Sequence, residues 1–241
     1  MTRRRGAAMG KFADAIRDRC KTRQRRLGFG AAADEPQASM LVGAIGVVEG
    51  ADFCLALSDD DIAAAESANV DLWGTRLEAL TAENVAGAKE RGAAFVSFEL
   101  EGARADGLLD EDMDYVVRLD DLRVEEADAR ALGSLRPTEI AVEVEFPVGL
   151  GTILNLRRLA MLVSAPMGVK CPTDISAGDI EALRDSGVAV LVLGPDVSAD
   201  DVAAVRQRVA DLPERKPKRD EGAQSLIPTM RPGADGGSDE D

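Results

Sequence analysis

From Met40 to Leu212 the chain alternates between short apolar runs and stretches of helical periodicity, and this alternation constrains the fold most. The apolar runs are MLVGAIG, FCLALS, VDLWGT, AAFVSFEL, YVVRL, EIAVEVEF, MGVKC and VAVLVLG. Repeated strand–helix units pair their strands in parallel. A succession of such units predicts an α/β protein with a compact or slightly degenerate (β/α)8 TIM barrel. An open sheet of seven or eight strands is the alternative.

Local signals mark where several of the predicted helices begin and end. Thr81, Ser176 and Ser198 offer N-cap oxygens, with acidic residues in the turns that follow. Gly92 and Gly187 lie where a helix would end in a left-handed residue. One connection is anomalous, because only VVEGAD separates the first two runs, whereas a parallel crossover needs about a dozen residues. We therefore expect the first helix to be missing or the first strand to be misassigned.

The chain divides into a basic head, a barrel and a charged tail. Residues 1–39 are predicted to form a basic N-terminal helix and linker, residues 40–212 the barrel, and residues 213–241 a disordered acidic tail rich in Pro, Gly and charge. The first 30 residues hold ten Lys or Arg and two Asp, although the whole chain carries a net charge of −15. The rest of the chain is therefore strongly acidic.

The basic head, residues 1–26, is predicted to bind something acidic. Phe12, Ile16 and Cys20 are spaced four apart, which indicates an amphipathic helix within residues 10–26. Its binding partner could be the protein's own body, in the same or another subunit, a protein partner or an anionic membrane. Nucleic acid is the least favoured partner, because the acidic body repels it and no aromatic platform accompanies the arginines.

The composition excludes several kinds of chemistry. The chain has no histidine, which removes the commonest general base and the commonest metal ligand. Cys20, Cys54 and Cys171 lack metal-ligand spacing and indicate reduced thiols in a cytoplasmic protein. The aspartates at 59–61 are better explained as a helix start than as a metal site. We expect no cofactor, no metal, no secretory signal and no membrane-spanning segment.

Strand alternation directs four charged side chains into the predicted barrel. Glu99, Arg118, Glu143 and Lys170 come from four successive strands and alternate in sign. Because an isolated buried charge is very costly, these side chains must pair. They form either a structural ion-pair ladder or a site in which Lys170 and a glutamate act as an acid–base pair or an anion clamp. A lysine in an apolar pocket also suits Schiff-base chemistry.

The catalytic candidates lie toward the carboxyl ends of the strands, where barrel active sites form. Glu145 lies one layer above Glu143, and Lys170 comes from the neighbouring strand, so these three are the predicted catalytic residues. The segment PVGLGT could present backbone amides to an anion. The predicted substrate-binding residues are Glu99, Arg118, Gly149, Gly151 and Gly194.

Residues 170–199 carry a strand, a serine-capped helix, the buried strand VAVLVLG, Gly194 and a second capped helix. This order resembles the last two units of the phosphate-binding type of TIM-barrel superfamily. In that superfamily a glycine-rich turn and a helix N-terminus hold a phosphate. Here CPTDISAG replaces the glycine-rich turn, and GPDVSADD brings a proline and three acids. The resemblance therefore implies the topology rather than the phosphate grip.

Two functions from different classes follow. The first is a cytoplasmic barrel enzyme of the lyase or aldolase type that acts on a small phosphorylated or carboxylated metabolite. The second is a non-catalytic barrel that serves as an interaction or structural module, docked through its basic N-terminal helix. The absence of histidine favours the second, and the frequent use of barrels as enzyme scaffolds favours the first by analogy. An open mouth would favour the enzyme, and a mouth plugged by side chains or by the N-terminal segment would favour the module.

Overall fold

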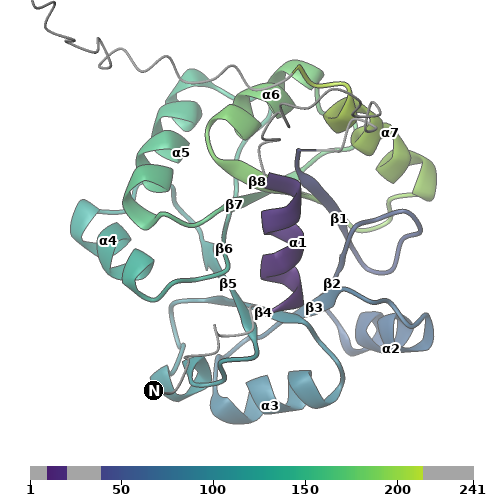
Figure 1. The fold of residues 1–241 in the computed structure, drawn as a ribbon, viewed down its shortest axis with the longest axis vertical. Coiled ribbons are helices and arrows are strands. Elements are labelled where there is room, and N and C mark those ends of the chain that lie inside the picture. The colour runs from purple at the N-terminus through teal and green to yellow at the C-terminus, as the bar shows by residue number, and fades with distance from the viewer. Residues whose placement is uncertain (1–9, 21–38, 214–241) are drawn as a thin grey trace, which may run out of the picture.

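In the computed structural model, which describes residues 10–20 and 39–213, eight parallel strands form a closed barrel (Figure 1). Each strand pairs with the next along the chain, and the last closes onto the first through the partners Leu41–Val190 to Ala44–Leu193. The predicted (β/α)8 barrel is confirmed, and the open sheet is wrong.

Every predicted apolar run contains all or most of a strand. The strands are β1 (Leu41–Ile45), β2 (Cys54–Ala56), β3 (Trp73–Arg76), β4 (Phe95–Glu99), β5 (Asp114–Leu119), β6 (Glu139–Val142), β7 (Met167–Cys171) and β8 (Val188–Leu193). The α-helices are α1 (Lys11–Cys20), α2 (Asp59–Ser67), α3 (Ala82–Glu90), α4 (Glu126–Ser134), α5 (Leu150–Val163), α6 (Ala177–Asp185) and α7 (Ala199–Ala210). Helices α2 to α7 surround the barrel in Figure 1.

Two strand connections lack an α-helix, and the first of them is the short connection for which the sequence predicted this. Strand β1 passes to β2 through residues 46–53, a loop without a helix in which Gly46 and Gly50 adopt φ angles of 79° and 84°. These are left-handed conformations that favour glycine. Between β4 and β5 stands only a short 3₁₀ helix, Ala105–Leu108.

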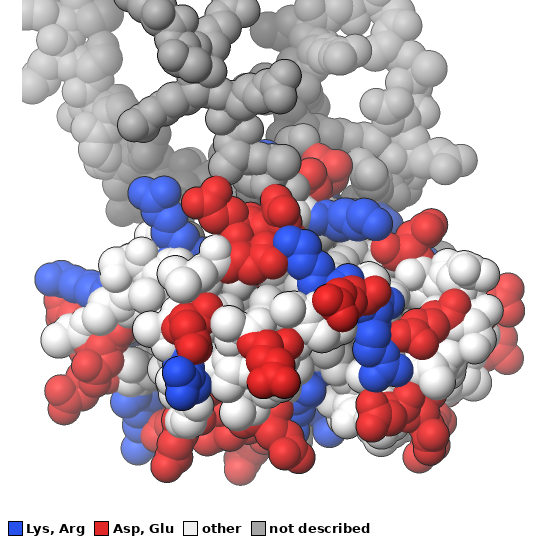
Figure 2. Space-filling model, turned by 90° about the horizontal axis from the view of Figure 1, so that it is seen from below, with Lys and Arg blue, Asp and Glu red and all other residues white. Residues whose placement is uncertain are grey.

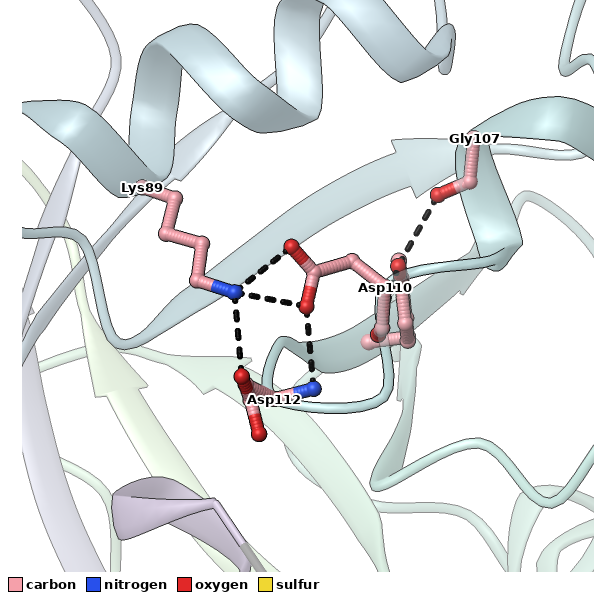
Figure 3. A network of polar contacts seen from close by, with 5 residues as sticks. Lys89, Gly107, Asp110 and Asp112 are labelled. Carbon is pink, nitrogen blue, oxygen red and sulfur yellow. Dashed lines mark hydrogen bonds and ion pairs between the residues drawn. The ribbon is translucent and has the colours of Figure 1, made fainter.

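A network of polar contacts fastens the connection between β4 and β5 to α3 (Figure 3). The Lys89 ammonium donates to both carboxylate oxygens of Asp110 at 2.8 and 2.7 Å, and to Asp112 at 3.2 Å. The backbone N–H of Asp112 donates to Asp110 at 3.0 Å, and the Tyr115 hydroxyl donates to the Gly107 carbonyl at 2.9 Å. Because exposed ion pairs contribute little stability, the network mainly orders the loop.

Helix α1 lies across the amino-terminal end of the barrel (Figure 1). Phe12 is completely buried, stacks on Phe95 with ring centroids 4.2 Å apart, and meets Phe53 edge-on at 5.1 Å. The Asp114 carboxylate, at the start of β5, accepts hydrogen bonds from the backbone N–H groups of Phe12 and Ala13 at 2.9 and 3.1 Å. A carboxylate at a helix N-terminus also interacts favourably with the helix dipole.

The basic side chains of α1 reach an acid of the barrel as well. Arg19 forms an ion pair of 2.8 Å with Asp52, whose carboxylate also accepts the Val42 N–H and contacts Arg206 of α7. The described part of the head therefore docks on the protein's own body. Helix α1 ends at Cys20, and the rest of the predicted 10–26 helix lies outside the described residues.

The predicted tail lies outside the described residues after Pro213, so its disorder and the proposed domain boundaries remain predictions. Within the described residues, no helix is long and apolar enough to cross a membrane. In the same ranges no group of three or more His, Cys, Asp or Glu side chains is placed to hold a metal ion.

Candidate active site

A cavity of about 140 Å³ occupies the barrel interior and reaches the carboxyl ends of the strands. Its floor includes the three rings of Phe12, Phe53 and Phe95, and its charged lining includes Lys170. Because α1 closes the opposite end, the N-terminal segment described here does not plug the mouth. Among residues 10–20 and 39–213, the mouth is therefore lined by side chains and left open.

Four charged side chains from β3 to the end of β6 form a chain of contacts around the mouth. Arg76 contacts the Glu99 carboxylate at 2.6 Å, and Arg118 contacts the same carboxylate oxygen at 3.1 Å. Arg118 also lies 3.8 Å from Glu143. The strands thus bring together Glu99, Arg118 and Glu143, three of the four side chains predicted to point inward.

These charges form a partly exposed rim rather than a ladder buried in the barrel. The side chains of Glu143 and Glu99 are 71% and 39% exposed. Lys170 is exposed at the end of β7 and forms no ion pair with any residue in the described part of the chain. Strand alternation gives the direction of each side chain but not its depth, which is why the sequence alone suggested burial.

Strand β6 is shorter than its sequence pattern predicts. Pairing with β7 ends at Val142, so Glu143 and Glu145 lie in the loop that leads to α5. Val144 and Phe146 still pack on the main core, which preserves the alternation after the ladder has ended. Glu143 lines the cavity, whereas Glu145 is exposed outside its lining.

The glycines predicted to bind substrate have different positions. Gly149 is the N-cap of α5 and Gly151 lies inside this helix, so the segment is a helix start rather than a separate loop. Neither glycine belongs to the cavity lining. Gly194 follows β8, and a Cβ there would lie 4.0 Å from Cε of Lys170. Gly194 therefore borders the Lys170 side chain.

The N-termini of α6 and α7, the helices that follow β7 and β8, are both capped by serine side chains. Ser198 and Asp201 form a capping box on α7, and the hydrogen bond from Ser198 lowers the pKa of Asp201. On α6, the Ser176 side chain accepts from the Asp179 N–H, and Asp179 accepts the Val148 N–H at 3.1 Å. A phosphate would meet carboxylates at both places, as the acids in the sequence suggested.

Two charged residues of the cavity, Arg76 and Glu139, were not predicted as site residues from the sequence. Arg76 lies one residue beyond the apolar run VDLWGT, and extending the alternation from Gly74 would have placed it inward. Glu139, at the start of β6, is 2% exposed, and its burial raises its pKa to about 8. Its inward direction follows from alternation with Ala141 and Glu143, but its complete burial does not.

Cys54 and Cys171, the cysteines whose side chains the structure describes, contribute no reactive group to the cavity. Cys54 and Cys171 are free and buried, in keeping with reduced thiols. Burial raises the pKa of Cys171 to about 12, so its thiol is inert near neutral pH.

No protein-family model matches the chain, and no curated protein matches it. Solved structures do. The structure of 3-keto-L-gulonate-6-phosphate decarboxylase from Vibrio cholerae O1 biovar El Tor str. N16961 matches with a TM-score of 0.56 and 12% identity, over 73% of this chain and 98% of that one. KGPDC from Streptococcus mutans matches with a TM-score of 0.55 and 11% identity, over 70% and 96%.

A 3-hexulose-6-phosphate synthase matches with a TM-score of 0.51 and 16% identity, over 71% of this chain and 99% of that one. At these identities the likeness shows the fold. The predicted resemblance to the phosphate-binding type of TIM barrel is confirmed at that level, without assignment to a specific family.

Proposed function

We propose that this protein is a lyase-type barrel enzyme that binds a small phosphorylated or carboxylated metabolite at its mouth. The observation that carries the proposal is Lys170, an exposed cation that lines the cavity without an ion-pair partner among the described residues. Arg76 and Arg118, in contrast, share the Glu99 carboxylate. An incoming anion would therefore interact most strongly with Lys170.

The charge around the mouth differs from that of the whole chain. Arg76, Arg118, Lys170 and Glu143 line the opening, and Glu99 contacts the two arginines from outside the lining, whereas the whole protein has a net charge of −15. On the side of the molecule in Figure 2, acidic and basic side chains are interspersed. A concave site with an excess of cations focuses its field and attracts small anions.

The same groups could support the cleavage of a bond beside a carbonyl group. Such a reaction develops negative charge on the carbonyl oxygen, and fixed cations such as Lys170 and Arg118 would stabilise that charge. Glu143 borders the cavity and could accept or return a proton. We leave Glu145 out of the proposed site because it lies outside the cavity lining.

The structural neighbours support the substrate class. Their names include a hexulose-6-phosphate synthase and a 3-keto-L-gulonate-6-phosphate decarboxylase, so comparable barrels act on small phosphorylated molecules. The interaction-module alternative has less support, because Phe12 and Ile16, the apolar face of α1, are buried against the protein's own barrel.

The proposal predicts that replacing Lys170 weakens the binding of small anions while the fold persists. Lys170→Met keeps the length of the side chain and removes its charge, so the dissociation constant of inorganic phosphate should rise about ten-fold or more. Calorimetry and thermal unfolding with phosphate and acetate measure this. Lys89→Met is the matched control, since Lys89 lies on α3 and contacts Asp110 and Asp112 instead of the cavity. If no anion stabilises the wild type, the proposal is wrong.

A further inference from the structure

Below its charged rim the cavity is almost entirely apolar. Two polar side chains interrupt this lining, Ser97 on β4 and Glu139 on β6, and each is 2% exposed. The apolar residues that surround them include Ile45, Leu55, Phe95, Val116, Ala141 and Val192.

Ser97 and Glu139 lie in one row of the sheet. Ser97 pairs with Val116, and Val116 pairs with Glu139, so the two polar residues flank one apolar residue on the strand between them. Neighbouring strands are about 4.8 Å apart, which puts these backbones about 10 Å from each other. Both side chains line the same cavity and can therefore contact the same ligand group.

Neither side chain has a hydrogen-bond partner among the described residues, and their oxygens border the cavity, since the fully enclosed unpartnered side-chain oxygen in that part of the chain is Ser39 Oγ. Gly168 leaves the space that the Glu139 carboxyl group occupies, because a Cβ at this position would lie only 1.7 Å from Oε1. Buried polar groups in folded proteins are normally hydrogen-bonded, and leaving one unpaired is costly. Two such groups in one apolar cavity indicate a site for a partner from outside the chain.

The position of Glu139 in the cavity lining is supported by its protonation state, which favours a partner that accepts a hydrogen bond. Burial raises its pKa to about 8, so at neutral pH the group is mostly an uncharged acid that can donate a hydrogen bond. Three basic residues line the same cavity, Arg76, Arg118 and Lys170, and none of them forms an ion pair with Glu139. Glu143 also lines it and is another acid. Asp114, on the neighbouring strand β5, is bonded instead to α1 and to Thr138.

We propose that this cavity binds an amphipathic anion, whose carboxylate or phosphate lies at the rim, whose apolar body fills the barrel interior, and whose far end presents a hydrogen-bond acceptor to Glu139 and Ser97. The inference rests on the proposed function, because the rim must bind the anionic group. It narrows the substrate class to small aromatic or branched aliphatic acids or phosphates that carry a carbonyl or similar group.

The size and chemistry of the cavity favour this class over sugar phosphates. Its volume of about 140 Å³ is close to that of engineered apolar cavities that bind benzene. Gly168, beside the Glu139 carboxyl, and Lys170 are two residues apart on β7, a rise of about 7 Å that one ring can span. The hydroxyl groups of a sugar would face Leu55, Val116 and Val192 without partners, which is unfavourable.

Calorimetry with matched probes tests the inference on the full-length protein. The probes are 4-acetylbenzoate, benzoate without the acceptor, inorganic phosphate without a body, glucose 6-phosphate with a polar body, and uncharged acetophenone. We expect 4-acetylbenzoate to bind tightest, about ten-fold more tightly than benzoate, since one hydrogen bond to a buried group separates them.

Two substitutions separate the apolar interior from the rim. Ala141→Leu fills the cavity, so it should abolish the advantage of the aromatic probes and leave phosphate binding unchanged. Glu139→Met removes the donor at similar size, so it should lower the affinity for 4-acetylbenzoate to that for benzoate. Thermal unfolding of each variant verifies that the fold is retained.

The outcomes distinguish this inference from the proposed function. If phosphate binds but the aromatic probes bind no better than glucose 6-phosphate, the inference is wrong and the proposed function stands. If acetophenone binds as tightly as 4-acetylbenzoate, the rim contributes nothing, and both the proposed function and the amphipathic class are wrong. If no probe binds, both are wrong as well.

Discussion

The two ends of the barrel use similar side chains in opposite ways. At the amino-terminal end, the Asp114 carboxylate accepts hydrogen bonds from two backbone N–H groups of α1. Asp52 forms an ion pair with Arg19, and the Asp52 side chain has little exposure to solvent. At the carboxyl end, the Glu99 carboxylate is shared by two arginines and is 39% exposed. One end is sealed by a helix and three aromatic rings, and the other remains open around charged side chains.

If the open end is the site that we propose, this difference separates stability from ligand binding in the barrel. Charges at the sealed end have their hydrogen bonds completed by the protein itself, so they can hold α1 in place. Charges at the open end are partly exposed, which leaves them able to contact the ligand that we propose. This division follows the general rule that barrel active sites form at the carboxyl ends of the strands. Three predictions test it, from the sealed end to the open end.

The largest effect is expected at the sealed end. Phe12→Ala removes the ring that stacks on Phe95 and contacts Phe53, so the free energy of unfolding should fall by about 3–5 kcal/mol. Denaturant unfolding measures it. Lys11→Ala, an exposed neighbour in the same helix, should change stability by less than about 0.5 kcal/mol. Equal, small losses in both variants would show that α1 does not hold this end together.

In the barrel interior, Glu139 should make the stability of the protein depend on pH. Burial raises the pKa of Glu139 from its ordinary 4.5 to about 8. Between these values the folded state keeps a proton that the unfolded state has released, so stability falls as pH rises, by up to about 1.4 kcal/mol per pH unit. Below pH 4.5 both states hold the proton, and above pH 8 both have lost it, so the group adds no slope there.

Glu139→Gln cannot lose a proton, so its stability relative to the wild type should increase from pH 5 to pH 8 and then stay constant. Denaturant unfolding of both proteins across this range isolates the group, because the other carboxylates are common to both. The total difference should reach a few kcal/mol, on the order of the integrated slope. Parallel pH profiles would show that Glu139 is not enclosed as the structure indicates.

The smallest effect is expected at the open end. Glu99→Gln removes the charge shared by Arg76 and Arg118, and because these groups are partly exposed, the loss should be below about 1 kcal/mol. The two arginines would then be free to bind an anion, so phosphate affinity should increase while stability barely changes. A stability loss as large as that of Phe12→Ala would contradict the division between the two ends.

Much of the fold follows from the sequence because strand and helix periodicities are local properties. All eight strands, the caps at Ser176 and Ser198 and the missing first helix could be predicted in this way. The sequence could not show where pairing stops. The alternation of β6 continues through Phe146, but its ladder ends at Val142, and only the tertiary structure decides this.

The sequence predicted which way the side chains of the candidate site point, but it did not predict how deeply they are buried. Alternation placed Glu99, Arg118 and Glu143 on the inner side, and they do contact one another. It could not distinguish an exposed rim residue such as Glu143 from a completely buried one such as Glu139, since both occupy the same face of one segment. Depth depends on barrel closure and on α1, which come from distant parts of the chain.

The closure of β8 onto β1 has a consequence for synthesis of the protein. Strand β1 pairs with β2 at only two residue positions but with β8 at four, and β8 lies almost 150 residues later in the chain. While the chain is being made, β1 therefore has one edge paired with β2 at two positions and one unpaired edge until residues 188–193 emerge. Exposed strand edges promote association between chains. Strand β8 therefore covers the edge of β1. A chain truncated before β8 would expose this edge in an open sheet and would tend to associate with other chains.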